Sequence, residues 1–477
     1  MKLLKNMFYN TSYQVLSLLL PLLVVPYVSR LLGATGIGLN TVTSAFAFYF
    51  VLFSSLGIQL YGNREIAAFQ GDKFQRSKIF FELNLLQLLA VIISAIIFLI
   101  FVFQIPNYRA LYLLQGVSII SVAFDITWYF KGIEDFRIIA VRNTIIKIIS
   151  VGLIFLLVRS SNDLWLYIAL TTFPVLLGNM SIWPFLRHEL VRVPLRELHI
   201  FSHFGSVLLL FLPLASLQLY PNITKTMLEF FHGATAAGFY FQSDTIVRVA
   251  FTLVTSFSAV FVSRLSKLVA DHEDKQVKEL TLKSLNLSTS VSFLLVAGLM
   301  GVSNTFVAAF LGSEFKDVSF LLFIESLVIL PIAWNTTLGP QFLLATRKMK
   351  AYTLAMILGL GANVILNFIV IPSFGALGAV IATVMAEIVI TGVEVWYVRE
   401  TFSLSELTKG FWKYGLAGAA TFFFVFWLNQ ELTVSFLHYI LIALLGTCVY
   451  IMILVGLRAA IVNEVRTILP RRFGGRK

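Results

Sequence analysis

Uninterrupted apolar runs of about 20 residues recur along the whole 477-residue chain, and they constrain its fold more than any other feature. As a helix, such a run crosses the roughly 30 Å hydrocarbon core of a bilayer. Inside lipid every backbone polar group needs an internal partner, so the runs must be helical. Only 13% of the residues are charged, against about 25% in soluble domains. The chain is therefore predicted to be an all-α polytopic membrane protein.

The apolar runs predict 14 transmembrane helices. Their expected bounds are residues 8–31, 38–61, 80–103, 111–130, 139–158, 164–186, 203–226, 236–262, 285–311, 318–341, 351–371, 376–398, 411–428 and 435–457. With a cytoplasmic N-terminus, 29 of the 36 lysines and arginines fall on the inner side and 5 on the outer side. Cytoplasmic loops are enriched in these residues, so the charge pattern supports the count. Both termini are then expected in the cytoplasm.

A short glycine motif occurs twice, 200 residues apart. Gly33-Ala-Thr-x-x-Gly38 returns as Gly233-Ala-Thr-x-x-Gly238, and each copy follows a helix with a Leu-Pro step and opens a long apolar run. Parallel repeats are typical of transporters. The motif predicts two six-helix bundles, residues 1–190 and 203–398, followed by helices 13 and 14 in 408–457 and a basic cytoplasmic tail, 458–477. The connections near 187–202 and 264–284 are expected to be amphipathic and to lie on the membrane surface.

Motifs for catalysis or cofactor binding are absent from the sequence. It contains no Walker A sequence, dinucleotide fingerprint, zinc spacing or nucleophile elbow. The lone Cys448 excludes disulfides and a cysteine metal site. We therefore expect no catalytic residues, no metal site and no cofactor, with proton or cation coupling left open. A membrane glycosyltransferase or polymerase would usually carry a large outer loop, for which the charge pattern leaves no room.

Basic side chains at membrane depth predict an anion-binding cavity, because such residues are costly in lipid and usually face a cavity. The candidates are Arg30, Arg142, Lys147 and Arg248. Lys147 has no acidic residue three or four positions away, which favours an anionic ligand or a partner from another helix. Arg248 follows Asp244 by four residues on one helix face. That spacing allows either a structural ion pair or a cavity cation whose charge is partly compensated by the Asp244 carboxylate.

Acidic side chains at depth are candidates for coupling transport to a proton or cation. They are Asp125 in the fourth predicted helix, Asp244 in the eighth, Glu325 in the tenth and Glu387 in the twelfth. Glu394 could reach only the inner interface, and some of these carboxylates could instead pair with the arginines.

The two glycine-rich turns resemble those of a known family. Tyr27-x-x-Arg30-x-Leu-Gly33-x-x-Gly36-x-Gly38 and Asn367-x-x-x-Ile371-Pro372-x-x-Gly375-x-x-Gly378-Ala379 resemble the polysaccharide-transporter branch of the multidrug/oligosaccharidyl-lipid/polysaccharide exporter superfamily. These are the Wzx-type flippases, and the resemblance covers the whole chain. Gly33, Gly38, Gly233, Gly238, Pro372 and Gly375 are its structural turn residues.

The resemblance implies a function. Wzx-type flippases move undecaprenyl-diphosphate-linked oligosaccharide across the bacterial cytoplasmic membrane for capsule, O-antigen or exopolysaccharide synthesis, through a cationic central cavity. The implied partners are the lipid-linked oligosaccharide, membrane lipids and the polymerase and glycosyltransferases of the same pathway, with no nucleic acid. A cation-coupled multidrug exporter of the same fold is the first alternative, and it would need a more acidic, aromatic cavity. A membrane glycosyltransferase or polymerase is the second.

Overall fold

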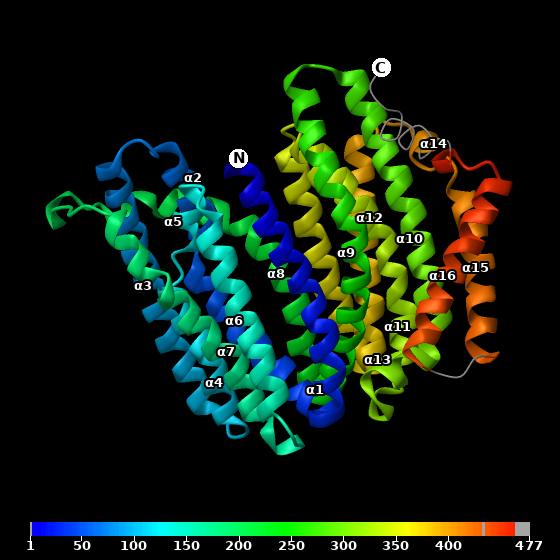
Figure 1. Ribbon diagram of the computed structural model, residues 1–477, viewed down its shortest axis with the longest axis horizontal. Helices are drawn as coiled ribbons and strands as arrows, with labels where there is room; N and C mark the ends of the chain where they lie inside the picture. Colours follow the sequence, from blue (N-terminus) through cyan, green and yellow to red (C-terminus); the bar gives the residue numbers. More distant parts are fainter. Residues whose placement is uncertain (1, 432–434, 463–477) are drawn as a thin grey trace. The chain divides into compact units, whose positions relative to one another are not determined.

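The computed structural model describes residues 2–431 and 435–462, and every regular element among them is helical (Figure 1). The all-α fold class is confirmed for these residues. The chain divides into two compact units, Met1–Gly238 and Phe239–Lys477. The predicted bundle boundaries at residues 190 and 203 remain predictions. The predicted basic tail lies outside the described residues from position 463 onward.

The first unit runs from α1 into the start of α9. Its elements are α1 (Lys2–Ser55), α2 (Ile58–Ala68), α3 (Lys73–Gln104), α4 (Arg109–Ala123), α5 (Thr127–Gly132), α6 (Phe136–Leu157), α7 (Leu164–Ser181), α8 (Phe204–His232) and the short turns η1 (Ser161–Asp163), η2 (Trp183–His188), η3 (Leu195–Glu197) and η4 (Ile200–His203). The second unit contains the rest of α9 (Ala234–Ala270), α10 (Asp274–Leu311), η5 (Ser313–Phe315), α11 (Val318–Glu325), η6 (Ser326–Val328), α12 (Ile329–Thr336), the π-helix η7 (Thr337–Leu344), α13 (Met349–Val398), α14 (Leu404–Leu407), α15 (Phe411–Glu431) and α16 (Phe436–Gly456).

Within the described residues, nine helical stretches are long and apolar enough to cross a membrane. Two of them, residues 20–68 and 349–398, are 49 and 50 residues long, about twice the length that one crossing needs. Each is broken inside by a glycine with positive φ, Gly33 at 68° and Gly375 at 55°. The chain is a multi-pass membrane protein, and the count of 14 crossings remains a prediction.

The repeated glycines occupy special backbone positions. Gly33 has φ 68° and ψ 179°, and Gly233 has φ 80° and ψ 174°, a region open essentially to glycine alone. Gly38 lies so close to α9 that a Cβ on it would stand 2.1 Å from the carbonyl oxygen of Ala234. Both copies of the motif therefore need glycine, one position for its conformation and the other for close packing.

Two sequence-based expectations are wrong in detail. The predicted helix 111–130 is interrupted after Ala123, so Asp125 lies in the irregular stretch before α5. The predicted long connection over 264–284 is instead two helix ends joined by a short turn, because α9 continues to Ala270 and α10 begins at Asp274. Its lysines and glutamates are good helix formers, so both helices extend beyond their apolar parts.

An aromatic core fixes α5 against α2 and α3. Trp128, Tyr129 and Phe80 are at most 1% exposed, and the rings of Phe80 and Trp128 stack with centroids 5.7 Å apart. Gly62 of α2 admits the indole, since a Cβ there would stand 2.5 Å from the Trp128 ring. This packing holds the stretch from Asp125 through α5 in place.

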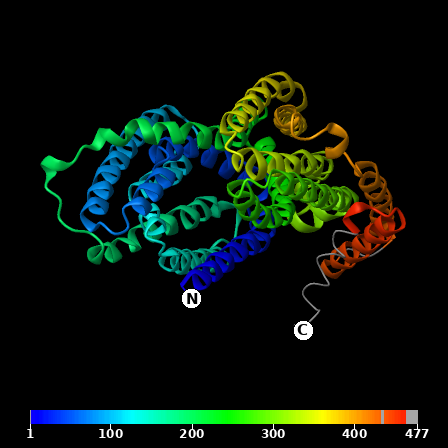
Figure 2. The same ribbon diagram turned by 90° about the horizontal axis from the view of Figure 1, so that it is seen from above.

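The chain between α7 and α8, residues 187–203, passes outside the helices of the first unit and is anchored to α3 (Figures 1 and 2). The backbone N–H of Val191 donates to Ser77 Oγ at 2.9 Å. The buried Glu82 accepts from the backbone N–H of His199 at 2.7 Å and lies 2.9 Å from His203 Nε2. The connection between the two predicted bundles is thus held by specific contacts.

Candidate functional site

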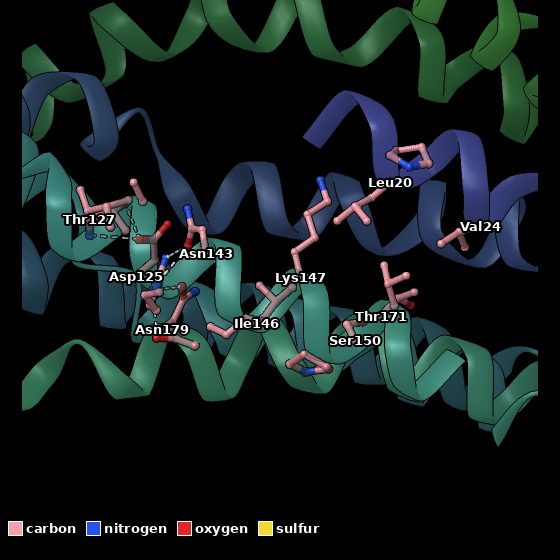
Figure 3. A pocket seen from close by; sticks show the side chains of 18 of the residues that line it. Leu20, Val24, Asp125, Thr127, Asn143, Ile146, Lys147, Ser150, Thr171 and Asn179 are labelled. Carbon is pink, nitrogen blue, oxygen red and sulfur yellow. Dashed lines mark hydrogen bonds between the residues drawn. The ribbon is translucent and has the colours of Figure 1, made fainter. Parts of the chain in front are cut away.

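A cavity of ≈ 780 Å³ lies within the first unit, between α1, α6 and α7 (Figure 3). Pockets for small ligands commonly enclose about 300–1,000 Å³. Leu20, Pro21, Val24 and Val25 of α1 form one apolar wall. The stretch from Asp125 to Lys131 closes one part of the rim. The cavity therefore brings together residues from four parts of the sequence: α1, the stretch before and in α5, α6 and α7.

The amphipathic pattern of α6 directs its polar residues into this cavity. Asn143, Lys147 and Ser150 line the cavity and follow one another at helical spacing. Between them, Ile145, Ile148 and Ile149 are each at least 50% exposed, as expected for side chains that face lipid. The helix consequently separates a lipid-facing apolar side from a cavity-facing polar side.

Lys147 reaches across the cavity toward the helix that carries Leu20 and Val24 (Figure 3). Its side chain starts from the middle of α6, between Asn143 and Ser150. The structure thus places Lys147, a cation that the sequence predicts at membrane depth, in a cavity wall. A primary ammonium offers three donors to an anion.

Arg142 is held rigidly at the same wall. Its Nη1 donates to the carbonyl oxygen of Gly178 at 2.9 Å and to Asn179 Oδ1 at 3.1 Å, and its Nε donates to Asn143 Oδ1 at 2.9 Å. Asn179 is itself fixed by a 2.9 Å bond to the carbonyl oxygen of Ser121. These three acceptors are neutral, and they orient the guanidinium at the cavity wall.

Asp125 is the one acidic side chain among the described residues that line this cavity. Its Oδ1 accepts from the backbone N–H and the hydroxyl of Thr127 at 3.1 and 2.7 Å, in the irregular stretch between α4 and α5. The cavity lining carries three basic residues, Lys131, Arg142 and Lys147. The balance of charges is therefore +2, which favours an anionic ligand.

The other predicted cations lie elsewhere. Arg30 is an exposed residue of α1, three positions before the Gly33 break, and it is not among the residues that line the cavity. Arg248 belongs to the second unit, where its Nε donates to both carboxylate oxygens of Asp244 at 2.7 and 2.8 Å. The side chain of Asp244 is 11% exposed and that of Arg248 is 45% exposed. The i,i+4 pair that the sequence allows is formed.

Two further coupling candidates are buried in the second unit. Glu325 ends α11 and is 0% exposed. Glu387 is 4% exposed and accepts from Asn335 Nδ2 at 3.3 Å. Glu394 is also wholly buried. A carboxyl group is costly to bury in charged form, and Glu325 and Glu387 remain candidates for proton or cation coupling.

Sequence reasoning missed several residues of the site. Lys131 counts in the sequence only as an inner basic residue, yet it lines the cavity. Asn143 and Asn179, which fix Arg142, are uncharged and do not stand out in the sequence. The spacing of Asn143, Lys147 and Ser150 on one helix face is the signal that could have found part of this wall. Asn179, by contrast, comes from another helix and could be found only from the fold.

Comparison with known proteins decides the family. The family described as "Polysaccharide biosynthesis protein" matches residues 3–269, more than half of the chain. The chain belongs to this family. The resemblance of its glycine turns to the polysaccharide-transporter branch is confirmed.

Individual relatives agree with the family. A protein assigned as an O-antigen transporter in Shigella dysenteriae is 24% identical over 378 residues, covering 78% of this chain and 94% of the relative. The capsular polysaccharide biosynthesis protein CapF of Staphylococcus aureus is 22% identical over 395 residues, covering 81% of this chain and 97% of the relative.

Solved structures show the same fold at low identity. The lipid II flippase MurJ, in an inward closed conformation, superimposes with a TM-score of 0.72 at 16% identity and covers 94% of this chain and 98% of that one. An inward-facing multidrug resistance MATE transporter superimposes with a TM-score of 0.65 at 16% identity. The match covers 82% of this chain and 95% of that one. By their names the O-antigen relative and these structural neighbours are transporters and a flippase, not enzymes.

Proposed function

We propose that the protein flips undecaprenyl-diphosphate-linked oligosaccharide from the inner to the outer leaflet of the bacterial cytoplasmic membrane. The product would feed capsule, O-antigen or exopolysaccharide synthesis. Transport would proceed by alternating access without nucleotide hydrolysis. The physical need is clear, because a charged, hydroxylated headgroup cannot enter hydrocarbon without losing its hydration.

The observation that carries this proposal is the charge of the ≈ 780 Å³ cavity. Lys147 and Arg142 offer ammonium and guanidinium donors to a diphosphate, and both groups bind phosphate oxygens strongly where water is scarce. The apolar wall from α1 lies opposite and suits the lipid end of such a substrate. In this proposal the diphosphate sits near Lys147 while Arg142 fixes its orientation.

The comparisons support the substrate class without naming the glycan. The family is one of polysaccharide biosynthesis, and two relatives in different bacteria are named for O-antigen transport and capsule synthesis. The partners that we propose are the lipid-linked oligosaccharide itself, surrounding lipids and the glycosyltransferases and polymerase that precede and follow the flipping step.

The proposed topology has 14 crossings and both termini in the cytoplasm. Cysteines introduced at the exposed positions Asn107 and Glu314 should react with an impermeant reagent added to intact cells. Cysteines at the exposed Gly71 and Lys348 should react only after permeabilisation. The background needs a Cys448→Ser substitution because Cys448 is exposed. Labelling of position 71 or 348 in intact cells contradicts the 14-helix topology.

A multidrug exporter of the same fold is the alternative that an assay can separate. Proteoliposomes would be loaded either with a lipid-linked oligosaccharide or with a cationic drug, at equal protein content. We expect transfer of the lipid-linked glycan and no accumulation of the drug. Drug transport without glycan transfer would overturn the proposed substrate class while leaving the family assignment intact.

A further inference from the structure

A second basic cavity lies in the first unit, and it shares no lining residue with the ≈ 780 Å³ cavity. It encloses ≈ 590 Å³ between the first half of α3 and the chain that follows α7. Phe80, Phe81, Trp183 and Leu186 form its apolar lining. Arg187 and Arg192 complete the lining, which contains no acidic residue. The combination is a hydrophobic surface edged by two positive charges.

Arg187 and Arg192 are available to a ligand. Both are exposed, and neither forms an ion pair or hydrogen bond with another described residue. The neighbouring basic residues of α3 are engaged, since Arg76 pairs with Glu189 at 3.5 Å and Lys73 Nζ donates to the carbonyl oxygen of His188 at 2.7 Å. Two guanidinium groups thus remain unpaired on one short segment.

The segment that carries these arginines is held in place before any ligand binds. The Val191 N–H bond to Ser77 Oγ fixes its middle at 2.9 Å. Trp183 Nε1 donates to the carbonyl oxygen of Phe124 at 3.0 Å, which orients the indole within the lining. Because backbone and indole are both anchored, binding would need little ordering of the chain.

The surroundings favour a membrane lipid as the occupant. Phe185 and Phe201, which lie in the chain between α7 and α8, are 51% and 71% exposed. Exposed aromatic side chains of this kind suit the membrane interface. The proposed topology places this segment on the cytoplasmic side, where anionic lipids attract clustered arginines. A guanidinium recognises a phosphate through paired hydrogen bonds, while an acyl chain can cover the aromatic lining.

We propose that this cavity binds one anionic phospholipid, with its phosphate between Arg187 and Arg192 and an acyl chain against Phe80, Phe81 and Trp183. The lipid would fasten the connection between α7 and α8 to the inner leaflet. The site does not depend on which substrate the transporter carries, so its test needs no transport measurement.

The test is native mass spectrometry of the full-length protein taken from bilayers of mixed phosphatidylglycerol and phosphatidylcholine. The wild type should retain phosphatidylglycerol in preference. The Arg187→Gln, Arg192→Gln double variant should lose this preference by roughly tenfold. The control is Lys348→Gln, Lys350→Gln, which removes the same charge from two exposed residues of the second unit. It should behave as the wild type does.

Two further measurements keep the result interpretable. The Arg187→Lys, Arg192→Lys double variant should retain part of the preference, since the charge survives without the paired hydrogen-bond geometry. If the glutamine variant fails to fold, the partial loss in the lysine variant tests the proposal in its place. Added undecaprenyl diphosphate should not displace the retained lipid. Equal retention of phosphatidylglycerol in the glutamine variant and its control overturns the proposal, and displacement by undecaprenyl diphosphate does so too.

Discussion

Gly38 and Gly238, 200 residues apart in the sequence, lie directly against each other. A Cβ on Gly238 would stand 2.8 Å from the backbone nitrogen of Gly38 and 2.9 Å from its Cα. The hydroxyl oxygens of Thr35 and Thr235 are 3.4 Å apart beside this contact. The last glycines of the two copies thus form a close backbone contact in the first unit, where no side chain fits between them.

We predict that Gly38→Ala lowers the stability of the protein by about 1–3 kcal/mol, because its Cβ would overlap the backbone of α9. Gly152→Ala is the matched control, since nothing lies within 4 Å of a Cβ at that α6 position. It should be neutral or stabilising. The stability of both variants is measured by thermal unfolding in detergent, with loss of the monodisperse gel-filtration peak as the readout. Equal transition temperatures for the two variants would contradict the close packing.

The second prediction concerns the conformation of Gly233. Its Cβ would meet nothing within 4 Å, so any cost of a side chain comes from the backbone at φ 80° and ψ 174°. We expect Gly233→Ala to destabilise the protein by about 1–3 kcal/mol. Gly233→Asn should be equally harmful, because asparagine tolerates the left-handed helical region but not this one. An asparagine variant as stable as the wild type refutes this explanation in the same unfolding assay.

The third prediction separates the two interpretations of Arg248. Arg248→Ala would leave the largely buried carboxylate of Asp244 without its partner, and we expect a loss of about 1–3 kcal/mol. Asp244→Asn should cost less, because Arg248 is 45% exposed and keeps access to solvent. The double variant Arg248→Ala, Asp244→Asn should recover stability relative to Arg248→Ala alone. If the double variant is no more stable than Arg248→Ala, the ion pair with Asp244 does not explain the contribution of Arg248 to stability.

The sequence was sufficient for those features that local chemistry determines. Apolar length predicted the helices, and the glycine pattern predicted turns at Gly33 and Gly233, because only glycine adopts their backbone conformation. The same reasoning placed Lys147 and Arg142 at depth on α6. That Asp125 lines the same cavity depends on where the helix before α5 is interrupted, which apolar periodicity alone does not reveal.

Contacts between distant segments were beyond sequence reasoning. Arg142 of α6 donates hydrogen bonds to Gly178 and Asn179 of α7. Nothing in the local sequence links these two residues to α6. The contact between Gly38 and α9 likewise depends on how α1 and α9 pack. A single sequence shows that each glycine is small, but it does not show which neighbour requires the small side chain.

In the proposed mechanism, Lys147 provides positive charge for a lipid-linked diphosphate in the cavity of the first unit. Losing one such charge should cost on the order of 1–3 kcal/mol of interaction with the substrate. Lys147→Arg keeps the charge and should retain much of the activity. Ile148→Ala is the matched control on the lipid-facing side of the same helix, where Ile148 is 51% exposed.

The most direct measurement is the initial rate of lipid-linked oligosaccharide transfer in proteoliposomes that contain equal amounts of folded protein. We expect Lys147→Ala to lower this rate by roughly 5- to 150-fold at limiting substrate. Lys147→Arg and Ile148→Ala should stay close to the wild type. An unchanged rate for Lys147→Ala would contradict the basic cavity as the substrate site.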